Sequence, residues 1–393
     1  MIMPVEFGGT STMIKRVFIL VLVAACSGSD DGAGSGTGDD VTGDDTMMSD
    51  AGPGGGIDPT ATTPKIGGCQ ILPADHIFNT KIDSLPALHE SDDYIDLIGR
   101  TKKVHLDLGT ETDPTSENYF GIPYNIVHGG SMNWAQVDYT TPDGDFDWDP
   151  RPESDCADAS KGIVSPCDHG SAFLPFTNNL AVEGGLSSAS DHQPAGDHHL
   201  IALDVDSCRL WEGYHVYKPS AGWQIFGSAT FDLTSNGLRP QEWTSADAAG
   251  FPILPLLLKP EEAESGEIKH ALRFTIPSGS IRATYSWPAR HDTGNHMEAN
   301  HPQMGQLFRL KSSFEIPASY SKQSKAILQA MKTYGMYIAD GGSAWYVSGT
   351  PGAWDTDTIL GEVQSLTGND FEAVDIHSIL EKSEFDGNSA RVP

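Results

Sequence analysis

The segment that decides the fold is His199-Leu-Ile-Ala-Leu-Asp-Val-Asp-Ser-Cys-Arg-Leu-Trp-Glu-Gly-Tyr-His-Val-Tyr217. Two apolar alternations, 199–205 and 209–217, flank the polar turn Asp204-Val-Asp-Ser207. Alternation with a period of two residues on both sides of a turn is typical of a β-hairpin. We therefore expect a hairpin near the centre of the chain and further strands around it.

Further short alternations, broken by Gly, Pro, Asn and Asp, predict strands at 224–233, 269–276, 282–287, 306–311 and 344–348. Helical spacing is rarer and predicts helices at 91–99 and 321–339, with short helical turns at 242–249 and 260–265. No linker rich in Pro, Ser and Gly interrupts the chain after residue 65. We expect residues 65–393 to form one large, mainly β domain, a β-sandwich or jelly roll with a few appended helices.

The N-terminal residues are typical of an export signal. Lys15 and Arg16 precede nine apolar residues, which is too short a run for a transmembrane helix but suits a signal peptide. The ending Val23-Ala-Ala-Cys26 resembles the lipobox of bacterial lipoproteins, in which the cysteine carries the lipid. We therefore expect residues 1–25 to be removed and Cys26 to anchor the protein. Ser27 after the cysteine favours the outer membrane, and either Met1 or Met13 is the start.

Residues 26–64 contain eight Asp and no Lys or Arg, with Gly, Ser and Thr as the main other residues. Such a segment cannot bury a core, so we expect a disordered acidic tether. The chain carries a net charge of -30, of which the signal contributes +1 and the tether -8, so -23 lies in residues 65–393. This acidity argues against nucleic acid as a partner. No Walker lysine follows the glycine-rich segments, which argues against nucleotide binding.

Four cysteines remain after Cys26, and an even number in an exported chain predicts two disulfides. Three connectivities are open. We favour Cys156–Cys167, which closes a short loop, and Cys69–Cys208, which joins the start of the domain to the central hairpin. No pair has CxxC spacing, which argues against zinc.

Several segments resemble a widespread family of exported bacterial proteins without an assigned activity. They lie across most of the domain, at 69–79, 121–125, 196–200, 238–240, 243–250, 270–275, 287–291 and 334–336, and include Cys69-Gln-Ile-Leu-Pro-Ala-Asp-His-Ile-Phe-Asn79 and Trp287-Pro-Ala-Arg-His291. The resemblance implies an extracellular, polysaccharide-related role by analogy. It implies no catalytic residues.

The second strand of the hairpin offers a candidate acid. Alternation places Glu212 and Val216 on one face, and Trp211, His215 and Tyr217 on the other. A carboxylate on an apolar face should have a raised pKa, as a general acid requires. The aromatic row suits stacking on sugars. The alternative for Glu212 is a structural role at a strand end or beside an arginine.

The segment Trp287-Pro-Ala-Arg-His-Asp292 offers a second group. Proline ends a strand, so we expect Arg290, His291 and Asp292 on a loop at a sheet edge, where sites are often built. Arg290 provides a fork for carboxylates or hydroxyls, and His291 offers an imidazole, the side chain most often used to transfer protons. The alternative is a structural Arg–Asp latch. His270, on an apolar strand face, is either a substrate contact or a core histidine.

Metal binding receives weaker support. His291, His296 and His301 recur every five residues in an irregular loop, which we interpret as solvated, and we assign no metal ligands. The carboxylates of Asp143-Gly-Asp-Phe-Asp-Trp-Asp149 alternate as in a calcium-binding loop, although they lack EF-hand spacing. Calcium is therefore the one cofactor for which the sequence gives any support. Glu183 lies beside two glycines and is a further candidate carboxylate.

Two functions remain open. The first is an enzyme that cleaves an extracellular polysaccharide, with Glu212 or Glu183 as the acid and Asp204 or Asp292 as its partner. Substrate would be bound by Arg290, His291, Trp211, His215, Tyr217, His270 and Trp287. A lyase would use His291 as base, but the net charge weighs against polyuronates and favours a glycoside hydrolase. The second is a non-catalytic surface lipoprotein that binds a glycan or a protein through the aromatic row.

Overall fold

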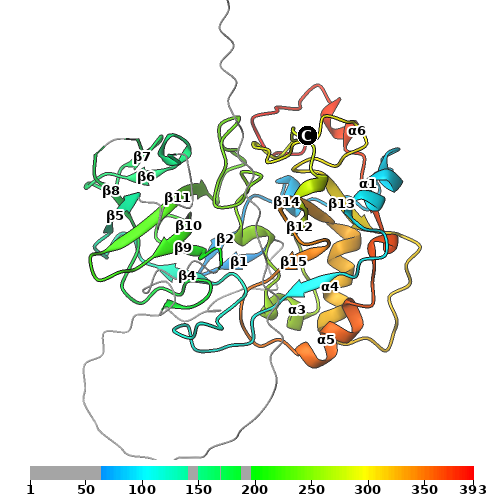
Figure 1. Ribbon diagram of the computed structural model, residues 1–393, viewed down its shortest axis with the longest axis horizontal. Helices are drawn as coiled ribbons and strands as arrows, with labels where there is room; N and C mark the ends of the chain where they lie inside the picture. The colour runs from blue at the N-terminus through cyan, green and yellow to red at the C-terminus, as the bar shows by residue number, and fades with distance from the viewer. Residues whose placement is uncertain (1–62, 140–148, 169, 187–195) are drawn as a thin grey trace, which may run out of the picture. The chain divides into compact units, whose positions relative to one another are not determined.

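The computed structural model describes residues 63–139, 149–168, 170–186 and 196–393 (Figure 1). All of them belong to one compact unit, Asp40–Pro393. The predicted signal peptide, Cys26 and the tether up to residue 62 lie outside the described residues, as does the acidic run except for Asp149. No described helix is long and apolar enough to cross a membrane.

Among the described residues, eight strands form one mixed sheet, in the order β4 (Tyr124–Val127), β9 (Leu200–Asp204), β10 (Arg209–Tyr217), β11 (Trp223–Asp232), β5 (Ala135–Tyr139), β8 (Ala172–Leu174), β6 (Cys156–Ala157) and β7 (Ile163–Val164). Six more form a second mixed sheet, in the order β16 (Phe371–Ala373), β13 (Leu307–Leu310), β14 (Met336–Gly342), β12 (Leu272–Pro277), β15 (Tyr346–Ser348) and β3 (His105–Asp107). A small pair joins β1 (Lys65–Ile66) to β2 (Cys69–Gln70).

The α-helices in the same residues are α1 (Ser91–Ile98), α3 (Pro260–Ser265), α4 (Lys322–Thr333), α5 (Thr356–Val363) and α6 (His377–Leu380). Helix α4 lies against the six-stranded sheet, because Ile327, Leu328 and Met331 pack into the same core as its strands (Figure 1). Strand accounts for 27% of the chain and helix for 17%, which confirms the mainly β prediction.

The predicted hairpin is present as β9 and β10, and Arg209 pairs with Asp204 at its turn. Its strands are buried on both faces. Ile201 and Leu203 join the large core that contains the six-stranded sheet, whereas Leu200 and Ala202 join a second core with Trp211. Alternation in this hairpin therefore separates two apolar environments, which explains why the strand sequence is almost continuously apolar.

Most predicted elements are confirmed within a few residues. The exceptions are 282–287, where only isolated bridges occur at Arg282 and Tyr285, and 242–249, which contains no helix. The helix predicted over 321–339 ends at Thr333, and β14 follows. Gly335 turns the chain with a φ of 76°, and an added Cβ would lie 2.5 Å from the carbonyl oxygen of Phe308. Only glycine fits this close approach.

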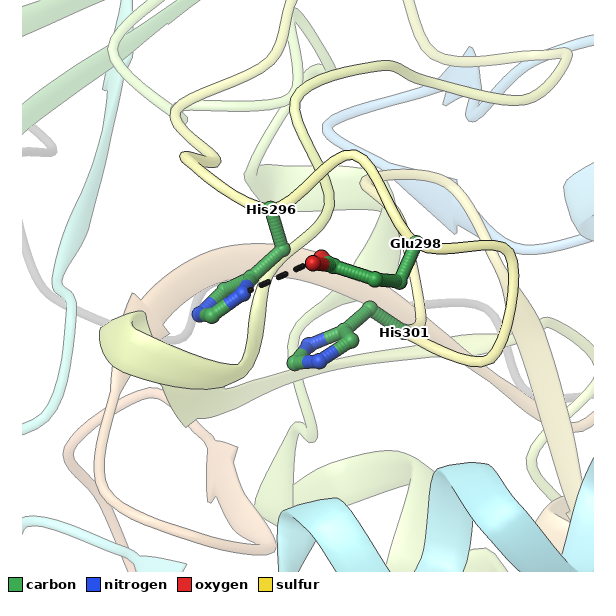
Figure 2. A group of neighbouring side chains, drawn as sticks. All are labelled: His296, Glu298 and His301. Atoms are coloured by element: carbon green, nitrogen blue, oxygen red, sulfur yellow. Dashed lines mark ion pairs between the residues drawn. The ribbon is translucent and has the colours of Figure 1, made fainter.

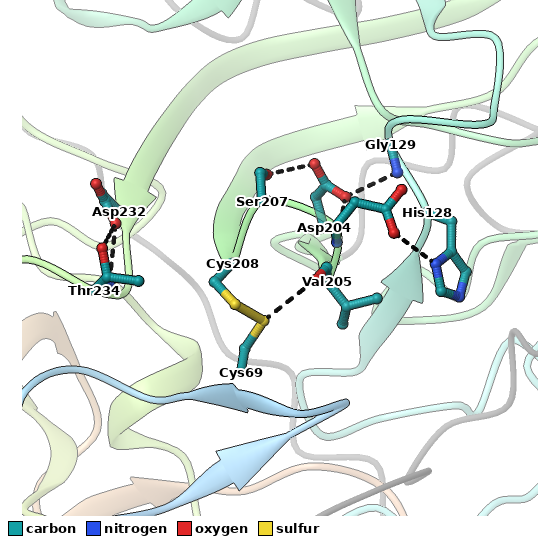
Figure 3. The surroundings of a disulfide bond; sticks show 10 residues. Cys69, His128, Gly129, Asp204, Val205, Ser207, Cys208, Asp232 and Thr234 are labelled. Atoms are coloured by element: carbon teal, nitrogen blue, oxygen red, sulfur yellow. Dashed lines mark hydrogen bonds and ion pairs between the residues drawn. A yellow bond between two sulfur atoms is a disulfide. The ribbon is translucent and has the colours of Figure 1, made fainter.

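Both favoured disulfides are confirmed: Cys69–Cys208 and Cys156–Cys167. The first joins β2 to the turn of the central hairpin (Figure 3). Two disulfides indicate that the protein folds outside the cytoplasm, because reducing compartments keep thiols free.

The two disulfides should stabilise the fold unequally. Their sequence separations are 139 and 11 residues, and a longer closed loop removes more entropy from the unfolded chain. We expect the double variant Cys69→Ala/Cys208→Ala to lose about 5 kcal/mol of unfolding free energy, and Cys156→Ala/Cys167→Ala about 3 kcal/mol. Denaturant unfolding of both variants measures the difference; equal losses or the reverse order would contradict it.

Candidate functional site

Glu212 has its carboxylate fully engaged. The side chain is 1% exposed and accepts the backbone N–H groups of Ile253 at 2.8 and 3.0 Å and of Leu254 at 3.1 Å. Burial raises the pKa of Glu212 to about 7, although these hydrogen bonds act to lower it. The pKa is therefore raised, as the sequence predicts. These N–H groups begin the short helical turn Leu254–Leu256, so Glu212 satisfies donors that would otherwise be buried alone.

Asp204 closes the hairpin turn (Figure 3). Its carboxylate accepts the backbone N–H of Gly129 at 2.8 Å, the backbone N–H of Asp206 at 3.1 Å and the hydroxyl of Ser207 at 2.5 Å. These three bonds tie the turn to the loop after β4, which is a structural task.

The aromatic row of β10 is not an exposed face. Trp211, His215 and Tyr217 are 1%, 8% and 1% exposed. His215 has a positive φ of 49°, which interrupts the alternation, and Val216 consequently packs in the second core with Trp211. The prediction that Val216 shares the face of Glu212 is wrong for this reason.

Trp287 and Arg290 hold the C-terminal residues. The indole N–H of Trp287 donates to the carbonyl of Ser389 at 2.8 Å. Arg290 is 5% exposed and donates to the carbonyls of Arg239 at 2.7 Å and of Gly387 at 2.9 Å. The segment is thus a latch made to backbone carbonyls.

The other candidates lie in separate surroundings. His291 donates from Nδ1 to the carbonyl of Ala248 at 2.9 Å, and Asp292 beside it is half-buried. His270 is 1% exposed, and its Nε2 lies 3.0 Å from the carboxylate of Glu262. It is therefore a core histidine with a partner.

Glu183 is the candidate that the structure places among other ionisable groups. His199, which immediately precedes β9, donates from Nδ1 to Glu183 Oε2 at 2.6 Å, and its Nε2 donates to the carbonyl of Ala246 at 3.2 Å. Burial alone would lower the pKa of His199, but the charge of Glu183, the hydrogen bond to Glu183 and the charge of Asp197 together outweigh burial and raise it to about 9. The charged imidazole in turn lowers the pKa of Glu183 despite its own burial. Glu183 is therefore ionised at neutral pH.

Asp107 and Asp197 interact electrostatically with this pair, and Asp340 interacts with Asp197. Asp107 ends β3, Asp340 lies in β14 and Asp197 precedes β9. All three are half-buried, and the side chain of Glu183 is 14% exposed. We call Asp107, Glu183, Asp197 and Asp340 the carboxylate cluster.

A buried ion pair lies next to the carboxylate cluster. Arg273 in β12 donates to both oxygens of Asp247, at 2.9 and 3.1 Å, and to the hydroxyl of Ser348 at 2.6 Å. Its positive charge partly offsets the rise in the pKa values of Asp107, Asp197 and Asp340 that burial causes. One arginine and one histidine therefore face five carboxyl groups, the four of the carboxylate cluster and Asp247. Because the positive charges are too few to offset five negative ones, some of these carboxyl groups should have raised pKa values.

The surroundings of three aspartates raise their pKa values. Burial, reinforced by the charge of Glu183, raises the pKa of Asp107 to about 6. Burial and the charge of Asp247 raise the pKa of Asp340 to about 7. Burial also raises the pKa of Asp197. The carboxylate cluster thus combines a glutamate whose pKa is lowered with aspartic acids whose pKa values are raised, which is the requirement for paired acid and base chemistry.

Aromatic rings adjoin these carboxyl groups. The phenol of Tyr346 hydrogen-bonds to Asp107, and that of Tyr214 hydrogen-bonds to Asp197. The ring of Tyr346 stacks on exposed His105, with centroids 4.5 Å apart and an interplanar angle of 13°. A half-buried aromatic surface beside an acid is suited to a sugar ring.

Sequence reasoning identified Glu183 but not its partners. A usable signal exists at the ends of the buried strands, because Asp107 follows buried Leu106 and Asp340 follows four buried residues, Met336–Ala339. A carboxylate that ends an apolar run indicates a polar site at a sheet edge. Arg273 and Asp247 carry no such signal, since their pairing depends on segments far apart in sequence.

A scan against protein-family models gives no match for this chain. Searches of curated proteins and of solved structures also give no match.

The raised pKa of Asp340 should make stability depend on pH. An unfolded Asp ionises near pH 4, whereas folded Asp340 holds its proton to about pH 7, so the free energy of unfolding falls as pH rises between these values. Asp340→Asn removes the ionisation and keeps an oxygen that can accept the N–H of Gly341.

We expect Asp340→Asn to be more stable than the parent by about 1–2 kcal/mol at pH 8, after allowance for solvent screening, and equal to it near pH 4. Urea unfolding across this range measures the effect, with exposed Asp83→Asn as the control. Parallel stability curves for the parent and Asp340→Asn would contradict the assignment.

Proposed function

We propose that the protein is an exported surface lipoprotein that hydrolyses an extracellular polysaccharide at the carboxylate cluster. The observation that carries the proposal is the pairing of Asp107, whose pKa is about 6, with Glu183, which His199 keeps ionised. Two neighbouring carboxyl groups with pKa values driven apart are the basis of acid–base cleavage of glycosidic bonds.

In this proposal Asp107 is the general acid, and it donates a proton to the oxygen of the leaving sugar. Glu183 is the ionised partner, which either activates water or attacks the sugar directly. Tyr346 and His105 offer the surface on which a sugar ring stacks. His199 and Arg273 are positioning residues, since they fix the charge of the carboxyl groups from within the protein.

Hydrolysis is favoured over elimination by the charge of the site. A lyase that acts on uronates needs positive charge to neutralise the substrate carboxylate, and Arg273 is instead 3% exposed and paired with Asp247. Ionised Glu183 would repel an anionic sugar. A neutral glycan is therefore the preferred substrate.

Anchoring and the finer architecture complete the proposal. Removal of residues 1–25 and lipidation of Cys26 would place the domain on the outer membrane, at the end of the acidic tether 26–64. The shared core of the two sheets, to which Ile201 and Phe274 both contribute, supports a sandwich-like arrangement of the domain.

A screen of the purified protein against neutral and acidic polysaccharides tests the proposal by reducing-end release. We expect a neutral glycan to be cleaved, and Asp107→Asn and Glu183→Gln each to lose at least about 100-fold in kcat/KM, because each removes one partner in proton transfer. The activity of the parent should fall as pH rises through about 6, where Asp107 loses its proton.

Asp83→Asn serves as the matched control, because Asp83 is exposed and lies outside the carboxylate cluster. Unsaturated products would show a lyase instead. Glycan binding without any product would support the non-catalytic alternative, and full activity in both cluster variants would overturn the assignment of acid and base.

A further inference from the structure

The loop from Gly294 to Pro302 brings three potential metal ligands together (Figure 2). His296, Glu298 and His301 each offer one ligand atom, and these atoms lie within 4.8 Å of one another. The two imidazole rings stack, with centroids 3.9 Å apart and an interplanar angle of 11°. Glu298 is exposed and both histidines are half-buried, so an ion can reach the group from solvent.

Backbone bonds hold this loop at both ends. The N–H of Ala283 donates to the carbonyl of His296 at 2.7 Å, and the N–H of Arg282 donates to the carbonyl of Pro302 at 2.8 Å. Gly294 lies so close to the same segment that an added Cβ would be 2.1 Å from the carbonyl oxygen of Arg282. The histidines are therefore presented from a backbone fixed independently of their side chains.

The hydrogen bonds of the two rings define their free nitrogens. His296 donates from Nε2 to the carbonyl of Gly279 at 2.8 Å, and His301 donates from Nδ1 to the carbonyl of Ser280 at 3.1 Å. A carbonyl oxygen only accepts, so these ring nitrogens carry the hydrogens. In the neutral rings, the lone pairs are on Nδ1 of His296 and Nε2 of His301. Metal-bound histidines are commonly oriented in this way by a backbone carbonyl.

The position of Glu298 fits the same interpretation. Its Oε2 lies 3.4 Å from Nδ1 of His296, the nitrogen with the lone pair (Figure 2). Two ligand atoms about 2.1 Å from one tetrahedral metal ion are roughly 3.4 Å apart. A metal ion can therefore replace the ion pair with little movement of these two residues.

We propose that His296, Glu298 and His301 bind one divalent transition-metal ion of the zinc class. Two imidazoles and one carboxylate suit zinc and its neighbours, whereas calcium and magnesium prefer oxygen ligands alone. Water completes the coordination. His291 is not a ligand, because it lies outside the group whose ligand atoms are within 4.8 Å of one another.

Titration of the purified full-length protein with Zn²⁺ against a chromophoric chelator tests the site. We expect one equivalent to bind with micromolar or tighter affinity, and His296→Ala, His301→Ala and Glu298→Gln each to weaken binding at least tenfold. X-ray absorption of the zinc-loaded protein should show nitrogen and oxygen neighbours at about 2.0–2.1 Å and no sulfur.

His377→Ala is the matched control, since His377 is an exposed histidine paired with Glu381 and lies on α6. Thermal unfolding without metal checks that each variant folds, and a zinc-dependent rise in Tm should occur in the parent and the control only. Affinity that stays unchanged in His296→Ala/His301→Ala, or displacement of zinc by an equal concentration of Ca²⁺, would overturn the proposal.

Discussion

The ion pair between Arg273 and Asp247 is the contact on which the rest of the site depends. The two residues are 3% and 0% exposed, and a buried charge without its partner is strongly destabilising. Asp247 belongs to the segment 246–254. Glu212 and His199, in or beside the eight-stranded sheet, hydrogen-bond to this segment. Arg273, in the six-stranded sheet, hydrogen-bonds to it from the other side. One short segment therefore connects both sheets to the charge that governs the carboxylate cluster.

This arrangement explains why neighbouring carboxyl groups differ in protonation. The positive charge of His199 stabilises the ionised form of Glu183, and Arg273 donates hydrogen bonds to Asp247. Asp107 and Asp340 are left with burial and like-charge repulsion, which raise their pKa values. The difference between base and acid thus follows from which carboxylate receives a cationic partner.

The sequence predicts the local features of this protein better than its long-range ones. Alternation located the hairpin, and the even cysteine count supported both disulfides. Apolar periodicity fails where every residue is buried, because a fully apolar run such as Met336–Ala339 does not distinguish helix from strand. It also fails where one residue with a positive φ interrupts the alternation, as at His215. For functional sites, Glu212 shows how far sequence-based prediction reaches. The sequence predicts its raised pKa but not the backbone N–H groups that hydrogen-bond to its carboxylate.

Direct titration of the carboxyl carbons tests the central claim, that Asp107 and Glu183 differ in protonation at working pH. Carbon-13 NMR of the protein labelled at Asp and Glu side chains, assigned with Asp107→Asn, Asp340→Asn and Glu183→Gln, follows each group. We expect midpoints near pH 6 for Asp107 and near pH 7 for Asp340, with Glu183 ionised throughout this range. Titration of all three groups together near pH 4 would contradict it.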